Sequence, residues 1–156
     1  MKVALSGIDL RDGALLSKVK KTLESLTVKT QIMKDDDDYR NAKEVDLVMV
    51  AGGDRGILDY FHKIEYDSAP VLGIYETDST GFLAQLDVKE LESATSQLKR
   101  GSYSVEEVFR LAVRVDGKQA DPVLNDVAVF PSKSATLMEH VLRIDANDIW
   151  HDKSDG

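Results

Sequence analysis

A nearly continuous apolar run, VDLVMVA (45–51), limits what this chain can fold into. A strand with one face open to water alternates apolar and polar residues, whereas a strand covered on both faces reads as an unbroken apolar run. Only Asp46, at the start of the run, carries a charge. We therefore expect residues 45–51 to form a strand inside a sheet that other elements cover on both faces.

Segments of strand and helix character alternate around this run. Three further strand candidates are rich in apolar or β-branched residues: 2–7, 28–33 and 70–75. Helices are expected where apolar residues recur at helical spacing, at 12–26, 57–64 and 87–99, with Asp87 as the N-cap of the last. This order predicts an α/β domain over residues 1–100, with a mostly parallel sheet and helical crossovers.

The character of the sequence changes after Gly101. Residues 105–118 and 122–130 are expected to be strands joined by a turn at Asp116-Gly117, and residues 137–146 a third strand. Three strands make a small sheet with exposed edges. We therefore expect residues 101–156 to be the start of a β-rich domain, an incomplete antiparallel β-domain.

Composition and charge exclude several classes of protein. The net charge of −8 and the pI near 4.8 argue against a nucleic-acid binder, which needs a concentrated basic surface. No apolar run approaches the roughly 20 residues that span a bilayer, so no membrane partner is expected. The chain has no cysteine, which excludes disulfides and thiolate metal sites and is compatible with a cytoplasmic location.

Two groups of residues could suggest a metal site, and we interpret both otherwise. The acidic run DDDD (35–38) lacks the spacing and the glycine of a calcium loop, so a solvated loop is the favoured interpretation. The three histidines are scattered without ligand spacing. No protein metal ligands are predicted.

The stretch AGGDRG (51–56) follows the apolar run directly. Ligands of open α/β sheets bind at the carboxyl ends of the strands, and glycines there let backbone N–H groups approach an anion. Asp54 suits the acceptance of a proton from a hydroxyl, and Arg55 could supply positive charge to a phosphate. In the alternative interpretation, Gly52 and Gly53 shape a tight turn and Asp54 caps the next helix.

Two later segments carry further polar residues that could serve a ligand. The stretch ETDSTGFLAQLD (76–87) contains a second glycine and leaves the same sheet edge as the Gly-Gly-Asp turn. The pair Asn125-Asp126 is embedded in apolar residues, where unpartnered polar groups are costly. The pair either makes a hydrogen-bonded corner or binds the hydroxyls of a ligand.

Taken in order, four segments resemble motifs of the NAD kinase family. AGGD (51–54) is similar to the start of that family's GGDG motif, and the stretch 70–87 to its segment of the type PILGIN-x-G-x-LGFLTE. Residues 123–145 resemble the segment with an Asn-Glu or Asn-Asp pair, and HDKSDG (151–156) the run ending in Asp-Gly. Arg55 stands where the family has the last glycine of GGDG, and the Thr-Pro-x-Gly-Ser-Thr-Ala-Tyr-like loop that follows Asp-Gly in the family is not in this sequence.

The resemblance implies a transfer of the terminal phosphate of ATP, or of polyphosphate, to the adenosine ribose 2′-hydroxyl of NAD. It makes NAD and ATP the small-molecule substrates and Mg²⁺, or another divalent cation, the cofactor. It also implies a homo-oligomer if the β-domain is complete.

The resemblance also assigns roles to individual residues. Asp54 would be the general base or the carboxylate that orients the hydroxyl, in a loop shaped by Gly52 and Gly53. Phe82 and its loop would approach the NAD adenosine. The remaining contacts with NAD would come from Asn125, Asp126, Asp155 at the nicotinamide end, and Lys153 near it.

Two other functions stay open at this stage. One is another kinase that shares the Gly-Gly-Asp loop and acts on a lipid or a sugar. The other is a nucleotide-binding or regulatory protein without catalysis, in which Arg55 has replaced a needed glycine.

Overall fold

The computed structural model describes residues 1–7, 13–64, 68–76 and 81–154. Within it the chain forms two compact units, residues 1–125 and residues 126–156. The domain boundary expected near residue 100 stays a prediction.

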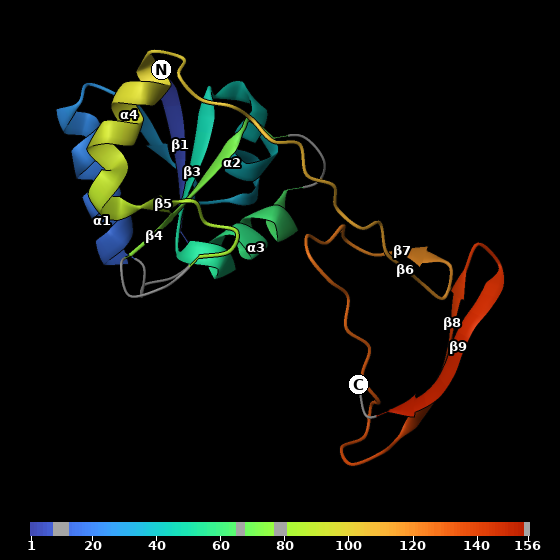
Figure 1. The fold of residues 1–156 in the computed structure, drawn as a ribbon. Helices are drawn as coiled ribbons and strands as arrows, with labels where there is room; N and C mark the ends of the chain where they lie inside the picture. Colours follow the sequence, from blue (N-terminus) through green and yellow to red (C-terminus); the bar gives the residue numbers. More distant parts are fainter. Residues whose placement is uncertain (8–12, 65–67, 77–80, 155–156) are drawn as a thin grey trace. The chain divides into compact units, whose positions relative to one another are not determined.

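A five-stranded parallel sheet forms the first unit, in the order β2-β1-β3-β4-β5 (Figure 1). The strands are β1 (Lys2–Gly7), β2 (Lys29–Ile32), β3 (Leu47–Ala51), β4 (Val71–Tyr75) and β5 (Leu86–Asp87). The first four lie where the sequence predicts them. The parallel α/β fold expected for this part of the chain is confirmed.

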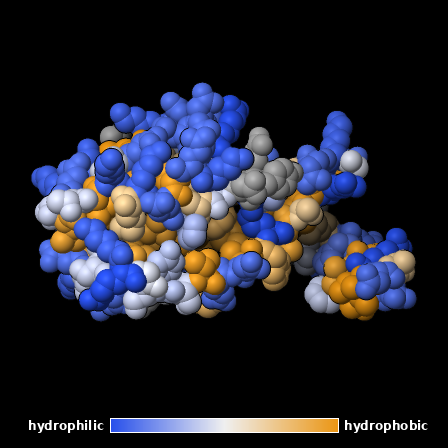
Figure 2. Space-filling view, turned by 90° about the horizontal axis from the view of Figure 1, so that it is seen from above, coloured by the Kyte–Doolittle hydropathy of each residue, from blue (hydrophilic) through white to orange (hydrophobic). Residues whose placement is uncertain are grey.

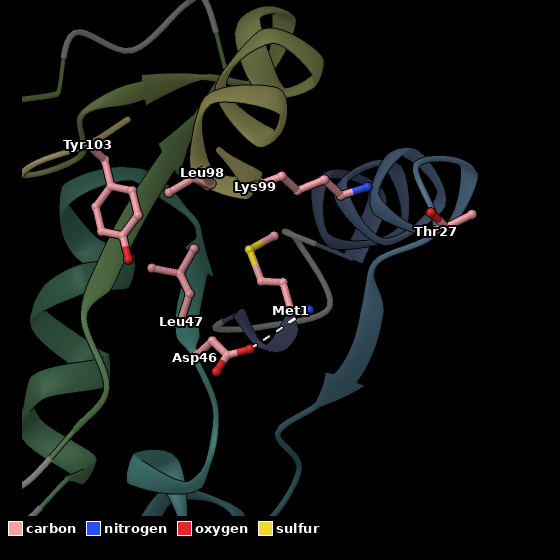
Figure 3. Close-up of a pocket in the computed structure, with 7 residues that line it drawn as sticks. All are labelled: Met1, Thr27, Asp46, Leu47, Leu98, Lys99 and Tyr103. Carbon is pink, nitrogen blue, oxygen red and sulfur yellow. Dashed lines mark ion pairs between the residues drawn. The ribbon is translucent and has the colours of Figure 1, made fainter. Parts of the chain in front are cut away.

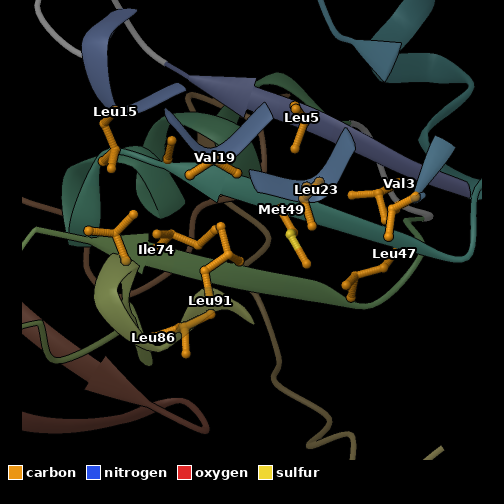
Figure 4. Packing of buried hydrophobic residues seen from close by; sticks show 13 residues of the cluster. Val3, Leu5, Leu15, Val19, Leu23, Leu47, Met49, Ile74, Leu86 and Leu91 are labelled. Carbon is orange, nitrogen blue, oxygen red and sulfur yellow. The ribbon is translucent and has the colours of Figure 1, made fainter. Parts of the chain in front are cut away.

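Four α-helices cover the two faces of the sheet. They are α1 (Gly13–Ser25), α2 (Asp36–Arg40), α3 (Gly53–Lys63) and α4 (Leu91–Lys99); η1 (Ala42–Glu44) and η2 (Val88–Glu90) are short 3₁₀ helices. Apolar residues of α1 and α4 share one core cluster with the sheet (Figure 4), and those of α2 and α3 share a second. The Asp87 side chain caps η2, where it accepts the Lys89 N–H at 2.9 Å. The single helix predicted over 87–99 is thus a 3₁₀ segment followed by α4, and the N-cap of α4 is Glu90 without a side-chain hydrogen bond.

β3 shows why its sequence is apolar throughout. All five of its residues are buried. Leu47 and Met49 belong to the cluster on the α1 and α4 side, whereas Val48 and Val50 belong to the cluster on the α2 and α3 side. Because successive side chains of a strand point to opposite faces, a strand between two helical layers must be apolar at every position.

The acidic run does not form the loop that the sequence suggested. Asp35 is the N-cap of α2, and its side chain accepts the Asp38 N–H at 3.0 Å. The carboxylates in the first turn of α2 face the partial positive charge of the helix N-terminus, which stabilises a short helix. The run is solvent-accessible, as expected, but it is helical.

The long strands expected over residues 105–118 and 122–130 are wrong. The structure places there a short hairpin of β6 (Arg114–Val115) and β7 (Lys118–Gln119), and a single bridge between Leu111 and Val123. The predicted turn is present, with Asp116 and Gly117 both at positive φ (51° and 77°). The apolar periodicity is real, but most large apolar side chains of this segment are exposed, so they supply little burial to stabilise long strands.

Arg110 links the segment after residue 100 to α3. The Arg110 guanidinium donates through Nη1 to the carbonyls of Phe61 at 2.8 Å and Ile64 at 3.0 Å. These carbonyls lie at the C-terminal end of α3, where the helix dipole favours a cation. Arg110 therefore also caps α3.

The second unit contains an antiparallel hairpin of β8 (Met138–Ile144) and β9 (Asn147–Ser154). β8 confirms the strand predicted at 137–146, whereas β9 was not predicted as a strand. The turn residues Asp145 and Ala146 have positive φ values (50° and 64°), the backbone twist that suits a two-residue hairpin loop.

Apolar side chains after residue 100 are largely open to solvent, and apolar atoms are visible at the surface in Figure 2. The exposed large ones are Tyr103, Val105, Val108, Phe109, Leu111, Val115, Val127, Val129, Phe130, Leu137, Val141, Leu142, Ile144, Ile149 and Trp150. Among the described residues, no helix is long and apolar enough to cross a membrane.

Candidate functional site

The Gly-Gly-Asp turn lies at the carboxyl end of β3, where α3 begins. Gly52 and Gly53 have φ values of 133° and 63°, a region that residues with a Cβ rarely adopt. A Cβ on Gly56 would lie 3.1 Å from Val50 Cγ1 and 3.3 Å from the Ala51 carbonyl oxygen. The glycines therefore allow α3 to start directly at the strand end and to pack closely against it.

The Asp54 carboxylate holds a second segment of the chain. Its Oδ2 accepts the Phe82 N–H at 2.7 Å, and its Oδ1 accepts the N–H groups of Leu83 and Ala84 at 2.8 Å each. Asp54 does not cap its own helix, because the N-cap of α3 is Gly52 without a side-chain hydrogen bond. The carboxylate instead joins the Gly-Gly-Asp turn to residues 81–84, which we call the Gly81 loop.

These hydrogen bonds determine the charge of Asp54. The N–H of Ala84 is the main cause that lowers the pKa of the carboxyl below 3.8, followed by that of Phe82; desolvation opposes the shift, and the Leu83 N–H adds to it. Hydrogen bonds to a carboxylate favour its ionised form. Asp54 is therefore a good hydrogen-bond acceptor and a weak proton acceptor.

Two further glycines allow the Gly81 loop to approach the sheet and Asp54. A Cβ on Gly81 would lie 2.5 Å from the Ala84 carbonyl oxygen and 3.2 Å from Asp54 Oδ1. A Cβ on Gly73, in β4, would lie 2.8 Å from Ala84 Cα and 2.4 Å from Ile57 Cδ1. Both glycines lie in the stretch 70–87 that resembles a family motif, but the sequence alone did not indicate a role for either.

Two exposed side chains flank this arrangement. The Phe82 side chain is 89% exposed although its backbone N–H is bound to Asp54. Arg55 is exposed in the first turn of α3 and makes no hydrogen bond or ion pair with any described residue. The turn therefore presents an aromatic ring, a cation and the positive end of a helix to solvent.

The other predicted site residues lie elsewhere in the chain. Asn125 and Asp126 are exposed, have interaction partners, and fall where one compact unit ends and the other begins. They do not lie in a buried strand as the sequence suggested, and Asn125 has a φ of 86° that suits a corner. Lys153 lies in β9, where its Nζ is 3.8 Å from Glu139 Oε2. Asp155 is outside the described residues.

One cavity lies away from the Gly-Gly-Asp turn (Figure 3). It has a volume of about 610 Å³, and it is lined by residues at the starts of β1 and β3, before β2 and at the end of α4: Met1, Thr27, Asp46, Leu47, Leu98, Lys99 and Tyr103. Since ligands of open α/β sheets bind at the carboxyl ends of the strands, we do not assign the ligand to this cavity. Asp46 in its wall is bonded to the backbone N–H of Lys2 at 2.7 Å.

The described residues do not fit a resident metal ion. Among them, no group of three or more histidine, aspartate or glutamate side chains could hold one. The Asp54 carboxylate already accepts three N–H donors. Mg²⁺ keeps near-octahedral oxygen coordination, often through substrate phosphates and water, and these residues alone do not provide it.

Comparisons with known proteins agree on one family. The chain is 37% identical over 116 residues to the NAD kinase of Azotobacter vinelandii. The aligned region covers 71% of this chain and 39% of that protein. It is 32% identical over 114 residues to the NAD kinase of Methanopyrus kandleri, covering 73% and 41%. No protein-family model matches the chain. The chain spans about two fifths of the length of these relatives.

A solved structure shows the same fold. The crystal structure of yeast NADH kinase complexed with NADH superimposes with a TM-score of 0.70 over 99% of this chain and 55% of that chain, at 15% identity. At this identity the likeness supports the architecture alone.

Proposed function

Because this chain belongs to the NAD kinase family, we propose that it takes part in the transfer of a phosphoryl group from ATP, or from polyphosphate, to the adenosine ribose 2′-hydroxyl of NAD. The observation that carries the proposal is the Asp54 carboxylate, which joins the Gly-Gly-Asp turn to the Gly81 loop. Two segments that resemble motifs of the family thus form a single site.

In this proposal Asp54 orients the acceptor hydroxyl. A carboxylate has about four lone-pair sites, so the three N–H donors leave one direction, on Oδ2, for a hydroxyl. Because its pKa is lowered, Asp54 is better suited to orienting the hydroxyl than to acting as a general base. Phosphoryl transfer depends mainly on alignment and on neutralised phosphate charge, and little on a strong base.

The resemblance implies that Phe82 contacts NAD, and the exposure of Phe82 and the charge of Arg55 support contacts for both. Phe82 would contact the adenosine of NAD, and Arg55 would pair with a phosphate at the N-terminus of α3. Asn125, Asp126, Lys153 and Asp155 remain proposed NAD contacts on the resemblance alone. Mg²⁺ enters only as the counter-ion of the ATP phosphates, and a homo-oligomer is proposed for the complete β-domain.

The direct test is NADP formation from NAD, ATP and Mg²⁺, with polyphosphate as the second donor. Asp54→Ala should lower turnover by about a hundredfold or more, because the hydroxyl loses its orienting acceptor. Arg55→Ala should raise the KM for ATP by about tenfold, and Arg55→Lys should restore part of the loss. Faster turnover in Arg55→Ala would contradict the phosphate role of Arg55.

One observation favours a second candidate, nucleotide binding without catalysis. The carboxylate proposed to act on the hydroxyl is already bound by three backbone donors. Binding of NAD measured by calorimetry, together with no NADP from either donor, would favour this candidate over the kinase.

A further inference from the structure

Three consecutive backbone N–H groups converge on one carboxylate in this structure. The donors belong to Phe82, Leu83 and Ala84, and all three hydrogen bonds are 2.7 or 2.8 Å long. Successive N–H groups that point to one side form a concave anion-binding site. Here the anion is a side chain of the same protein, 28 to 30 residues away in sequence.

The geometry of the Gly81 loop depends on this carboxylate and on one glycine. Residues 81–84 form no helix or strand, and β5 begins only at Leu86. A Cβ at position 81 would lie 2.5 Å from the Ala84 carbonyl oxygen, so only glycine allows the loop to close on itself and on Asp54. In this arrangement the Phe82 side chain is exposed.

We propose that Asp54 is the positioning residue for the Gly81 loop, with Gly81 as the residue that permits its closure. One carboxylate then fixes two parts of the site: the acceptor that orients the hydroxyl and the loop that presents Phe82. The expected effect of Asp54 on NAD recognition rests on the proposed function, whereas its hydrogen bonding to the Gly81 loop does not. Loss of the carboxylate therefore weakens NAD recognition as well as turnover.

The holding of the loop is tested without any substrate. Amide hydrogen exchange of Phe82, Leu83 and Ala84 is measured by NMR in the wild type, Asp54→Asn and Gly81→Ala. Both variants should exchange these amides at least about tenfold faster, because the loop loses its anchor or its closure. Gly13→Ala is the matched control, since a Cβ there meets no atom within 4 Å. Unchanged exchange in Asp54→Asn overturns the proposal.

The coupling to NAD is tested with Gly81→Ala, which keeps the carboxylate. We expect the KM for NAD to rise about tenfold while the KM for ATP stays unchanged, because the loop presents Phe82 and not the proposed phosphate contact Arg55. An unchanged KM for NAD overturns the coupling. If the wild type neither binds NAD nor forms NADP, the proposed function fails, and the exchange measurement still decides whether Asp54 positions the loop.

Discussion

β3 is apolar at all five positions and β8 at four of seven, and the two strands have opposite surroundings. β3, LVMVA, is buried at all five positions between two helical layers, whereas β8, MEHVLRI, is exposed or half-exposed at all seven. β3 has a strand on each side in a five-stranded sheet, and β8 pairs only with β9 among the described residues. Apolar sequence therefore makes a strand in both places, but only a layer of side chains on each face makes a core.

The largest expected difference between the two regions concerns matched leucines. Leu5 in β1 is fully buried, and Leu137 beside β8 is 68% exposed. Leu5→Ala should lower the free energy of unfolding by about 2–5 kcal/mol, because it leaves a cavity among packed side chains. Leu137→Ala should change it by less than about 0.5 kcal/mol. Urea unfolding measures both, and equal effects would contradict the comparison.

A smaller difference is expected for matched glycines. Gly73→Ala should lower the free energy of unfolding by about 1–3 kcal/mol, because its Cβ would lie 2.8 Å from backbone Ala84 Cα. Gly117 lies in the β6–β7 turn, where a Cβ meets no atom within 4 Å but φ is 77°. Gly117→Ala should cost about 1 kcal/mol in unfolding experiments, the lower end for a residue with a Cβ at positive φ. A larger effect at Gly117 would show that turn geometry matters more than packing.

The smallest expected difference is in how two carboxylates, Asp54 and Glu139, contribute to the pH dependence of stability. The pKa of Asp54 is lowered, so its hydrogen bonds stabilise the fold fully above about pH 4, and this contribution is lost as pH falls through the lower folded pKa. Asp54→Asn should therefore lower stability by about 1–2 kcal/mol at neutral pH and flatten the acid limb of the stability curve. Glu139, paired with His151 at 2.6 Å on the exposed hairpin, serves as control.

Glu139→Gln should change the free energy of unfolding by less than about 0.5 kcal/mol, because exposed ion pairs contribute little. Thermal unfolding between pH 3 and pH 7 measures both variants. If the stability of Asp54→Asn falls toward low pH as steeply as that of the wild type, other carboxylates dominate the pH dependence.

Local patterns in the sequence were enough for β1 to β4 and for α1, α3 and α4, but not for α2 or β5. The apolar run of β3, the helical spacing of Leu15, Val19 and Leu23, and the cap at Asp87 each reflect interactions over a few residues. The long strands expected after residue 100 were wrong because strand length depends on a partner and on a covering layer. Neither condition can be inferred from a single segment.

For the candidate site, the sequence determined which residue types are present, and the tertiary structure decided what Asp54 does. The glycines and the carboxylate at 52–54 could be identified from their place after a buried strand. That Asp54 bonds to Phe82, Leu83 and Ala84 could not, because the partners are 28 to 30 residues away and donate through the backbone. Every residue except proline carries such an N–H, so only the path of the chain shows which ones reach the carboxylate.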